Sequence, residues 1–393
     1  MRIVMTMMVR DEIDILAAMI EHHLAQGVDL IIATDNASVD GTTEVLAAYE
    51  AAGKLELHHD PEHRKQQGVV VTRMARRAYT EHGADWVVNA DADEFFVPVD
   101  TRLTLREAFE RIPTDLGAFT ADVVNLVGRP VERGAGIPPA LWRDLRPVSA
   151  LHDIGIHAHP TPNALHRGDP DVTVSQGNHF VSIRSKGQPP PAVALQTLHL
   201  PWRSYAQLEA KVTAAGRAYA ANPQLRPSKN HHGMSDYRRF EGGRLRQIWA
   251  LRQPLERDLI AGEEAGWFVR DTYLRARLDE LVATAIRPDL LKACLDNSAD
   301  VVVPTARHEQ DGLTGRAFLA LERERSDALD LAAAEAAKRK AAAEEAAKFR
   351  KAANQAKREL QVLRQEPLPA LAKRTAARAG RAAARRARRA LGR

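Results

Sequence analysis

The sequence of 393 residues is 45% apolar and 27% charged, which suits a globular protein of about two or three domains with a sizeable core. Its single cysteine, Cys294, excludes a disulfide within the chain, and no apolar run reaches the roughly 18 residues of a membrane-spanning helix. The first residues do not form a signal peptide, because acidic residues follow their short apolar run. We therefore expect a cytoplasmic protein, either free or peripheral on the inner face of the cell membrane.

The net charge of +5 is unevenly distributed along the chain. Residues 331–393 contain 18 Lys and Arg against 5 Asp and Glu, a net charge of +13, which leaves −8 for residues 1–330. The basic character belongs to the C-terminal part, so it does not indicate that the body of the protein binds nucleic acid.

The first hundred residues alternate strand-like and helix-like segments. Apolar runs predict four strands, at 3–9, 28–33, 55–57 and 86–89. Helical spacing of apolar residues predicts helices between them, at 12–26, 42–52 and 69–82. This order predicts an α/β fold with a largely parallel sheet covered on both faces. Ligands of such a sheet bind at the carboxyl ends of its strands, where polar segments lie at 10–12, 35–40 and 91–94.

The remainder of the chain changes character twice. Residues 117–200 are irregular, with strands expected at 118–127 and 180–183, and the sequence becomes helical from Arg203, with a clear helix at 204–221. An Ala-, Glu-, Lys- and Arg-rich stretch predicts one long helix at 316–366, which Pro367 ends. A weak coiled-coil seam within it indicates self-association, through Phe349, Ala353, Ala356, Leu360 and Leu363.

The most informative segment is ADWVVNADADEFF at 84–96. Three carboxylates, of Asp91, Asp93 and Glu94, follow a buried strand, where they would repel each other and resist burial unless a cation offset their charge. Carboxylate oxygens suit Mg²⁺ and Mn²⁺, usually together with the phosphates of a substrate. Asp91 and Asp93 are two residues apart, so both can approach one ion. A solvated acidic loop and a phosphatase-like aspartyl nucleophile are the alternatives, and Phe95 and Phe96 fit the second poorly.

The segment DNASVDGT at 35–42 is at least a strand-to-helix turn, in which Asp40 or Thr42 can cap the next helix. Because it ends a strand near the acidic segment, Asp35 is also a candidate acceptor for the base or ribose of a nucleotide.

Four separated segments resemble the family 2-like glycosyltransferases of the GT-A fold, in the branch whose acidic motif reads Asp-x-Asp-Glu-Phe. They are VRDEIDIL at 9–16, TDNASVDGT at 34–42, WVVNADADEFF at 86–96 and LHLPWRSYAQLEAKVTAAGRAYAANP at 198–223. The resemblance implies a GT-A domain, a Rossmann-like sheet flanked by helices, that uses a nucleotide-diphospho-sugar donor and Mn²⁺ or Mg²⁺. We accordingly divide the chain into a catalytic domain at 1–235, a helical extension at 236–315, the long helix at 316–366 and a basic tail at 367–393.

The resemblance also implies roles for individual residues. The metal ligands it implies are Asp91, Asp93 and His199. The contacts to the donor nucleotide that it implies are Arg10, Asp11, Glu12, Asp35 and Asp91, with Arg203 and Lys211 available to the diphosphate. Arg203 lies where a helix begins at Ser204, and helix N-termini favour anions. The alternatives are a hydrogen-bonded core histidine for His199 and a solvated helix face for Arg203 and Lys211.

An inverting enzyme of this kind also needs a general base for the acceptor hydroxyl. The resemblance implies an acidic residue between the metal motif and the late histidine, where Asp153, Asp169 and Asp171 lie. We prefer Asp171, and His179 is a second catalytic candidate.

The expected acceptor is a carbohydrate or glycolipid hydroxyl, in the synthesis of surface polysaccharide or glycolipid, by analogy with the family. Two other functions stay open: a sugar nucleotidyltransferase, which typically has a Gly-rich phosphate loop that is not visible here, and a non-catalytic scaffold.

The tail at 367–393 has nine Lys and Arg and no acidic residue. Five arginines share one helical face: Arg374, Arg378, Arg381, Arg385 and Arg388. We expect either a peripheral electrostatic contact with an anionic membrane or a solvated tail, and no specific nucleic-acid partner.

Overall fold

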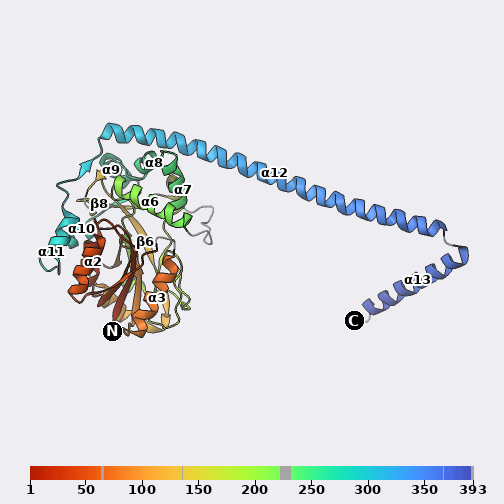
Figure 1. Ribbon diagram of the computed structural model, residues 1–393, viewed down its shortest axis with the longest axis horizontal. Helices are drawn as coiled ribbons and strands as arrows, with labels where there is room; N and C mark the ends of the chain where they lie inside the picture. Colours follow the sequence, from red (N-terminus) through yellow and green to blue (C-terminus); the bar gives the residue numbers. More distant parts are fainter. Residues whose placement is uncertain (63–65, 135, 222–231, 366, 391–393) are drawn as a thin grey trace. The chain divides into compact units, whose positions relative to one another are not determined.

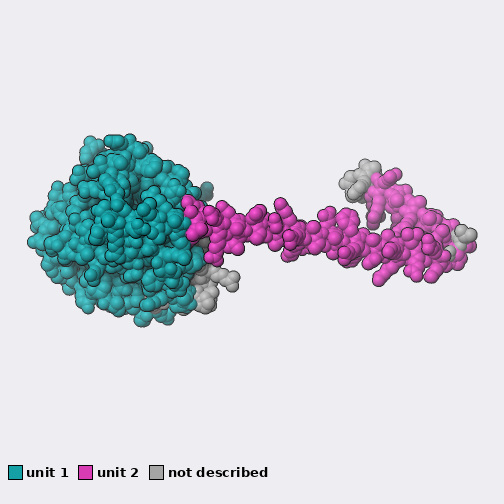
Figure 2. Space-filling view, turned by 90° about the horizontal axis from the view of Figure 1, so that it is seen from above, with its two compact units in different colours: residues 1–319 teal, residues 320–393 magenta. Residues whose placement is uncertain are grey.

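The computed structural model describes residues 1–62, 66–134, 136–221, 232–365 and 367–390. The chain divides into two compact units, residues 1–319 and residues 320–393 (Figure 2). The first unit therefore contains both the predicted catalytic domain and the predicted helical extension.

The strands in chain order are β1 Ile3–Val9, β2 Leu30–Asp35, β3 Leu55–His59, β4 Trp86–Ala90, β5 Glu94–Pro98, β6 Ala118–Val127, β7 Val131–Arg133, β8 Leu141–Asp144, β9 Asn163–Arg167, β10 Leu195–His199, β11 Phe268–Asp271 and β12 Val301–Val302. The helices are α1 Leu16–Ala25, α2 Thr42–Ala51, α3 Gln67–Thr80, α4 Leu105–Arg111, α5 Val148–Asp153, α6 Tyr205–Ala220, α7 His232–Glu241, α8 Leu245–Arg252, α9 Glu256–Glu264, α10 Leu274–Leu281, α11 Pro288–Leu295, α12 Thr305–Gln365 and α13 Leu368–Ala390. Short 3₁₀ turns lie at Thr114–Leu116 and Pro191–Val193.

The central sheet runs in the order β11-β8-β6-β9-β4-β1-β2-β3, with β10 and β5 joined to it at β6. The strands β3, β2, β1 and β4 are parallel and are connected through α1, α2 and α3, as the sequence predicts. Beyond β4 the pairs are antiparallel except for β6 with β10. The α/β fold class is confirmed, but the sheet is mixed, because the segment after β5 lacks the regular crossover helices that parallel pairing requires.

Successive side chains of β1 point to opposite faces of the sheet, and each face has its own hydrophobic cluster. Ile3, Met5 and Met7 face the cluster that contains α1, whereas Val4 faces the cluster that contains α3. In Figure 1, α2, α10 and α11 lie on one side of the sheet and α3 on the other. The parallel strands are thus buried on both faces, which explains their continuous apolar sequences. Gly27, with φ of 95°, follows the end of α1, as predicted.

Two predicted elements differ in the structure. The segment at 180–183 forms no strand and contributes only a single bridge, from Val181 to Val174. The long helix α12 begins at Thr305 rather than at residue 316. Its first turns are buried at His308, Gly312 and Gly315, because the two glycines allow a close approach to α8. Composition alone did not show this start, since these turns lack the Ala- and Lys-rich pattern of the rest.

The second unit consists of the later part of α12 and the helix α13. The seam residues Phe349, Leu360 and Leu363 are exposed on α12. Among the described residues, no helix is long and apolar enough to cross a membrane.

Candidate functional site

An open pocket of about 210 Å³ lies at the carboxyl ends of β1 and β4, beside α6. Its charged and amide-bearing lining residues are Arg10, Glu12, Asn36, Gln66, Gln67, Asp91, Asp93 and Lys211. Ala214, Ala215 and Ala218 of α6 complete the wall with small side chains. The pocket therefore has the position that the strand order predicts for a ligand site.

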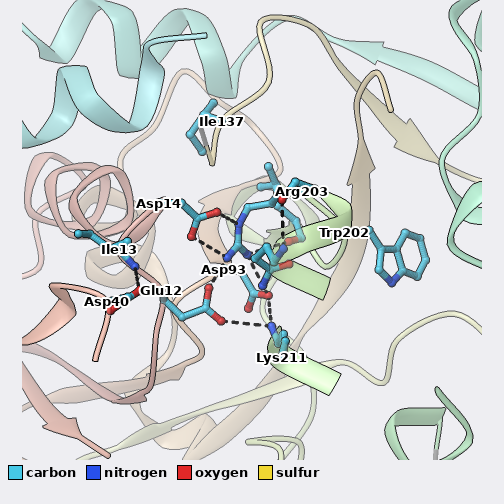
Figure 3. A network of polar contacts seen from close by, with 12 residues as sticks. Glu12, Ile13, Asp14, Asp40, Asp93, Ile137, Trp202, Arg203 and Lys211 are labelled. Atoms are coloured by element: carbon cyan, nitrogen blue, oxygen red, sulfur yellow. Dashed lines mark hydrogen bonds and ion pairs between the residues drawn. The ribbon is translucent and has the colours of Figure 1, made fainter. Parts of the chain in front are cut away.

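Asp93 is the centre of an ion-pair network within this pocket (Figure 3). Its Oδ2 atom lies 2.5 Å from the Nζ of Lys211, and Arg203 Nη1 and His199 Nε2 each lie 3.6 Å from the same oxygen. Burial alone would raise the pKa of Asp93, but the charges of Lys211, His199 and Arg203 outweigh it and hold that pKa well below its usual range. Asp93 is thus ionised and matched by cations.

Arg203 joins this network to the loop after β1. Its guanidinium donates to both carboxylate oxygens of Asp14, at 2.8 and 3.0 Å, and it also pairs with Glu12. The side chain is completely buried (0% exposed) and its partners are carboxylates of the protein, so its contact with the donor diphosphate stays a prediction. Burial lowers the pKa of Arg203, but the carboxylates of Asp14 and Glu12 outweigh this effect and raise it. Arg203 holds the site together.

Lys211 is partly exposed, whereas Arg203 is buried, although both side chains contact the carboxylates of Glu12 and Asp93. Its Nζ lies 3.5 Å from Glu12 Oε1 as well as close to Asp93, and its side chain is 42% exposed at the pocket wall. Two turns along α6, which begins after the N-cap Ser204, it reaches the carboxyl end of β4. Lys211 is therefore available to a ligand in the pocket.

Asp91 lines the same pocket but has other partners. Its Oδ1 accepts hydrogen bonds from Gln67 Nε2 at 2.7 Å and from Asn178 Nδ2 at 3.1 Å. The neighbouring Glu94 is buried, and its Oε2 accepts from the backbone N–H of Asp91. Burial and the charge of Asp91 raise the pKa of Glu94 to about 7. The idea that Asp91 and Asp93 share one cation stays a prediction.

Some of the predicted nucleotide contacts in the loops after β1 and β2 line the pocket, and others do not. Arg10 lines the pocket and donates from Nη1 to the backbone oxygen of Asn36 at 2.6 Å. Asp35 is buried, and its carboxylate accepts from Ser38 in the turn and from Thr43 in the first turn of α2, so it fixes the turn to the helix and does not line the pocket. Asn36, which sequence reasoning missed, lies at the pocket in its place.

Asp11 joins these two loops rather than lining the pocket. It has a positive φ of 52°, and its Oδ1 accepts from the backbone N–H of Val39 at 2.7 Å. Glu12 does line the pocket, and burial, opposed by Arg203 and Lys211, raises its pKa.

The two catalytic candidates lie in different surroundings. Asp171 is exposed, and Arg76 of α3 donates to its backbone oxygen, so it lies on the outer side of α3 and does not line the pocket. The sequence around Asp171 has no local pattern that would show that this residue lies away from the pocket. His179 follows Asn178, the partner of Asp91, and burial lowers its pKa. His179 thus lies beside the site, and Asp171 does not.

The residues around Asp93 provide donors of the kind a divalent cation takes. Asp93 Oδ2 and His199 Nε2 are 3.6 Å apart, which suits two ligands of one ion at bonds of about 2.1 Å. His199 Nδ1 lies 2.9 Å from Asn125 Oδ1, and this contact orients the ring. Among the described residues, no three His, Cys, Asp or Glu side chains are placed to hold a metal. The pair therefore fits an ion whose remaining ligands come from phosphate and water.

Comparison with known proteins shows a family match by sequence over part of the chain. Residues 4–115 match the family model described as glycosyltransferase family 92. That segment contains the parallel strands and the pocket residues Arg10, Glu12, Asp91 and Asp93, whereas α6 and Lys211 lie beyond it. No curated protein matches the sequence.

Solved structures show only distant similarity. Residues 1–349 of TarS from S. aureus are 11% identical over 83% of this chain and 92% of that chain, with a TM-score of 0.32. The same part of TarS in complex with UDP-GlcNAc is 12% identical over the same shares, with a TM-score of 0.31. HddC from Yersinia pseudotuberculosis is 11% identical over 51% of this chain and 77% of that chain, with a TM-score of 0.24. Such low TM-scores support no conclusion about this chain. The family match over residues 4–115, which build most of the pocket, indicates that this protein is a glycosyltransferase.

Proposed function

We propose that the protein transfers a sugar from a nucleotide-diphospho-sugar to a hydroxyl of a carbohydrate or glycolipid acceptor, with inversion at the anomeric carbon and with Mn²⁺ or Mg²⁺. The observation that carries the proposal is the charged pocket at the carboxyl ends of β1 and β4, most of whose lining residues belong to the segment that matches a glycosyltransferase family. The inversion and the acceptor class rest on the resemblance of the four sequence segments alone.

The charge of the pocket supports a cation. Three carboxylates line it, those of Glu12, Asp91 and Asp93, against two basic side chains, those of Arg10 and Lys211. A nucleoside diphosphate adds at least two negative charges to this excess. A divalent cation bound by Asp93 and His199 would offset them and would stabilise the departing diphosphate.

The chain's own residues can be given separate tasks. Lys211, at the pocket wall, would contact the diphosphate, and Arg10, which fixes the loop containing Asn36, would contact the nucleotide. Arg203 would keep Glu12 and Asp93 in place. For the general base we retain His179, because it lies beside the partner of Asp91.

Calorimetry with UDP and GDP, each with and without Mn²⁺, tests the proposal. We expect one nucleotide to bind in a Mn²⁺-dependent manner, and hydrolysis of one nucleotide sugar in a donor screen. A chain that binds neither nucleotide under any of these conditions would be the non-catalytic scaffold. Release of pyrophosphate from a nucleoside triphosphate and a sugar phosphate would instead show a sugar nucleotidyltransferase.

We also propose that α13 brings the enzyme to an anionic membrane surface. Its arginines at 374, 378, 381, 385 and 388 are spaced on one face, and each basic residue near such a surface contributes about 1 kcal/mol. Alanines fill much of the opposite face, so the helix would lie on the surface and not insert deeply. In flotation with anionic liposomes, the full chain should float at low salt and a chain ending at Gln365 should not. Equal flotation of both would contradict the proposal.

A further inference from the structure

The segment from Val174 to Val181 forms a small hairpin against the first turns of α3. A single antiparallel bridge joins Val174 and Val181, and the backbone N–H of Ser175 donates to the oxygen of Phe180 at 2.8 Å. Thr72 of α3 donates from Oγ1 to the backbone oxygen of Val174 at 3.2 Å and accepts from its N–H at 2.9 Å. The hairpin is therefore fixed to the helix whose first residue, Gln67, lines the pocket.

The tip of this hairpin places Asn178 against the pocket from outside. Asn178 has a φ of 64° and is 1% exposed, and its backbone oxygen accepts from the N–H of Ala164 at 2.9 Å. Asparagine adopts this left-handed conformation more readily than most residues. With the backbone held in this way, the side chain reaches Asp91 Oδ1 at 3.1 Å.

A second amide approaches the same oxygen from α3. Gln67 Nε2 donates to Asp91 Oδ1 at 2.7 Å. The orientation of Gln67 is fixed in turn, because Gln176 of the hairpin donates to its Oε1 at 2.5 Å, and the backbone N–H of Gly68 donates to Gln176 Oε1 at 3.4 Å. A chain of amides thus begins in the hairpin and ends on the carboxylate of Asp91.

We infer that Asn178 and Gln67 are positioning residues for Asp91. Two hydrogen bonds to one carboxylate oxygen fix the rotation of the Asp91 carboxylate. Asp91 can then meet a cation bound to the nucleotide sugar without first having to be ordered. Neither amide needs to touch the donor for this task. The inference rests on the proposed function, because it gives Asp91 a ligand to meet.

The variant Asn178→Gly tests the side-chain amide of Asn178 without changing its backbone conformation. Glycine keeps the positive φ and removes the side chain together with its hydrogen bond to Asp91. Gln67→Met tests the second amide at nearly constant size. The matched control is Ser182→Ala, because Ser182 Oγ accepts from the N–H of Thr173 next to the ends of the hairpin and makes no hydrogen bond to Asp91.

Calorimetry with UDP and Mn²⁺ gives the first readout. We expect Asn178→Gly to bind UDP about tenfold or more weakly in Mn²⁺, the usual effect of removing a partner that orients a metal ligand. Ser182→Ala should bind as the wild type does, and both variants should unfold at similar temperatures. Equal UDP affinity in Asn178→Gly and Ser182→Ala would overturn the inference.

Crystal structures give a readout that needs no nucleotide. If the wild type binds neither UDP nor GDP, the proposed function fails, and the inference is then judged on the structure of Asn178→Gly alone. An Asp91 side chain that turns or takes several conformers in this variant supports the positioning role. An Asp91 carboxylate unchanged from the wild type overturns it.

Discussion

Replacing Arg203 by methionine should destabilise the first unit severely. The guanidinium is completely buried and makes two hydrogen bonds to Asp14, a pair with Glu12 and a hydrogen bond to the backbone oxygen of Leu200 at 3.2 Å. Methionine fills similar space, so the loss is electrostatic: buried carboxylates remain without their cation. Breaking a buried pair in this way costs about 3–5 kcal/mol. That is a large part of the roughly 5–15 kcal/mol by which a domain is stable.

Urea unfolding of Arg203→Met beside Lys211→Met measures this difference. Lys211 shares Asp93 and Glu12 with Arg203, but its side chain is 42% exposed, so its loss should cost about 1 kcal/mol or less. Adding Asp14→Asn to Arg203→Met should restore part of the stability, because one stranded charge is removed. A cost below about 1 kcal/mol for Arg203→Met, or equal costs for the two single variants, would refute the assignment of Arg203 as a buried support.

Three further outcomes follow from the structure. Asp93→Asn should abolish Mn²⁺-dependent nucleotide binding in calorimetry, and unchanged turnover would remove its assigned role. Burial lowers the pKa of His166 to about 4, so the folded chain keeps this ring neutral. Its stability contribution is complete above pH 6.5 and decreases as the pH falls toward 4. The part of the loss that is due to His166 should be about 2 kcal/mol at pH 5, measured in urea unfolding as the difference between the losses of the wild type and His166→Gln. If the exposed Phe349 and Leu360 of α12 join two copies of the chain, changing both to lysine should lower the mass in sedimentation, and an unchanged mass would contradict self-association.

The sequence predicted the part of the site that depends on local pattern. Apolar runs locate β1, β2 and β4, and their parallel pairing brings the residues that follow them to one edge. That reasoning placed the segments 10–12, 35–40 and 91–94 at one edge, and all three contribute to the pocket, although Asp11 and Asp35 do not line it. The prediction succeeded because strand ends are fixed by hydrophobic periodicity, which a sequence displays directly.

The supports of the site depend on distant contacts, which a sequence does not display. The resemblance made Arg203 available to a diphosphate, and the structure pairs its guanidinium with Asp14, 189 residues earlier. Likewise Asn178 reaches Asp91 across 87 residues, from a hairpin of which the sequence predicted only a strand at 180–183. The antiparallel pairing of β9 with β4 and β6 places this hairpin, and no local pattern specifies that pairing. In both cases the tertiary fold, and not a local sequence pattern, brings the two partners together.

The position of Lys211 leads to one more prediction about the cation. The Nζ of Lys211 lies 2.5 Å from the Asp93 oxygen that also faces His199 at 3.6 Å, so the ammonium holds the place that a divalent cation would take. On the proposed function, a bound cation displaces this ammonium, and the freed charge meets the diphosphate. Lys211→Met should therefore bind Mn²⁺ alone more tightly, because a competitor is gone, yet bind UDP with Mn²⁺ more weakly, because a contact to the diphosphate is lost. Calorimetry measures both affinities on one sample. Weaker binding of Mn²⁺ alone would show that Lys211 supports Asp93 and does not compete for it.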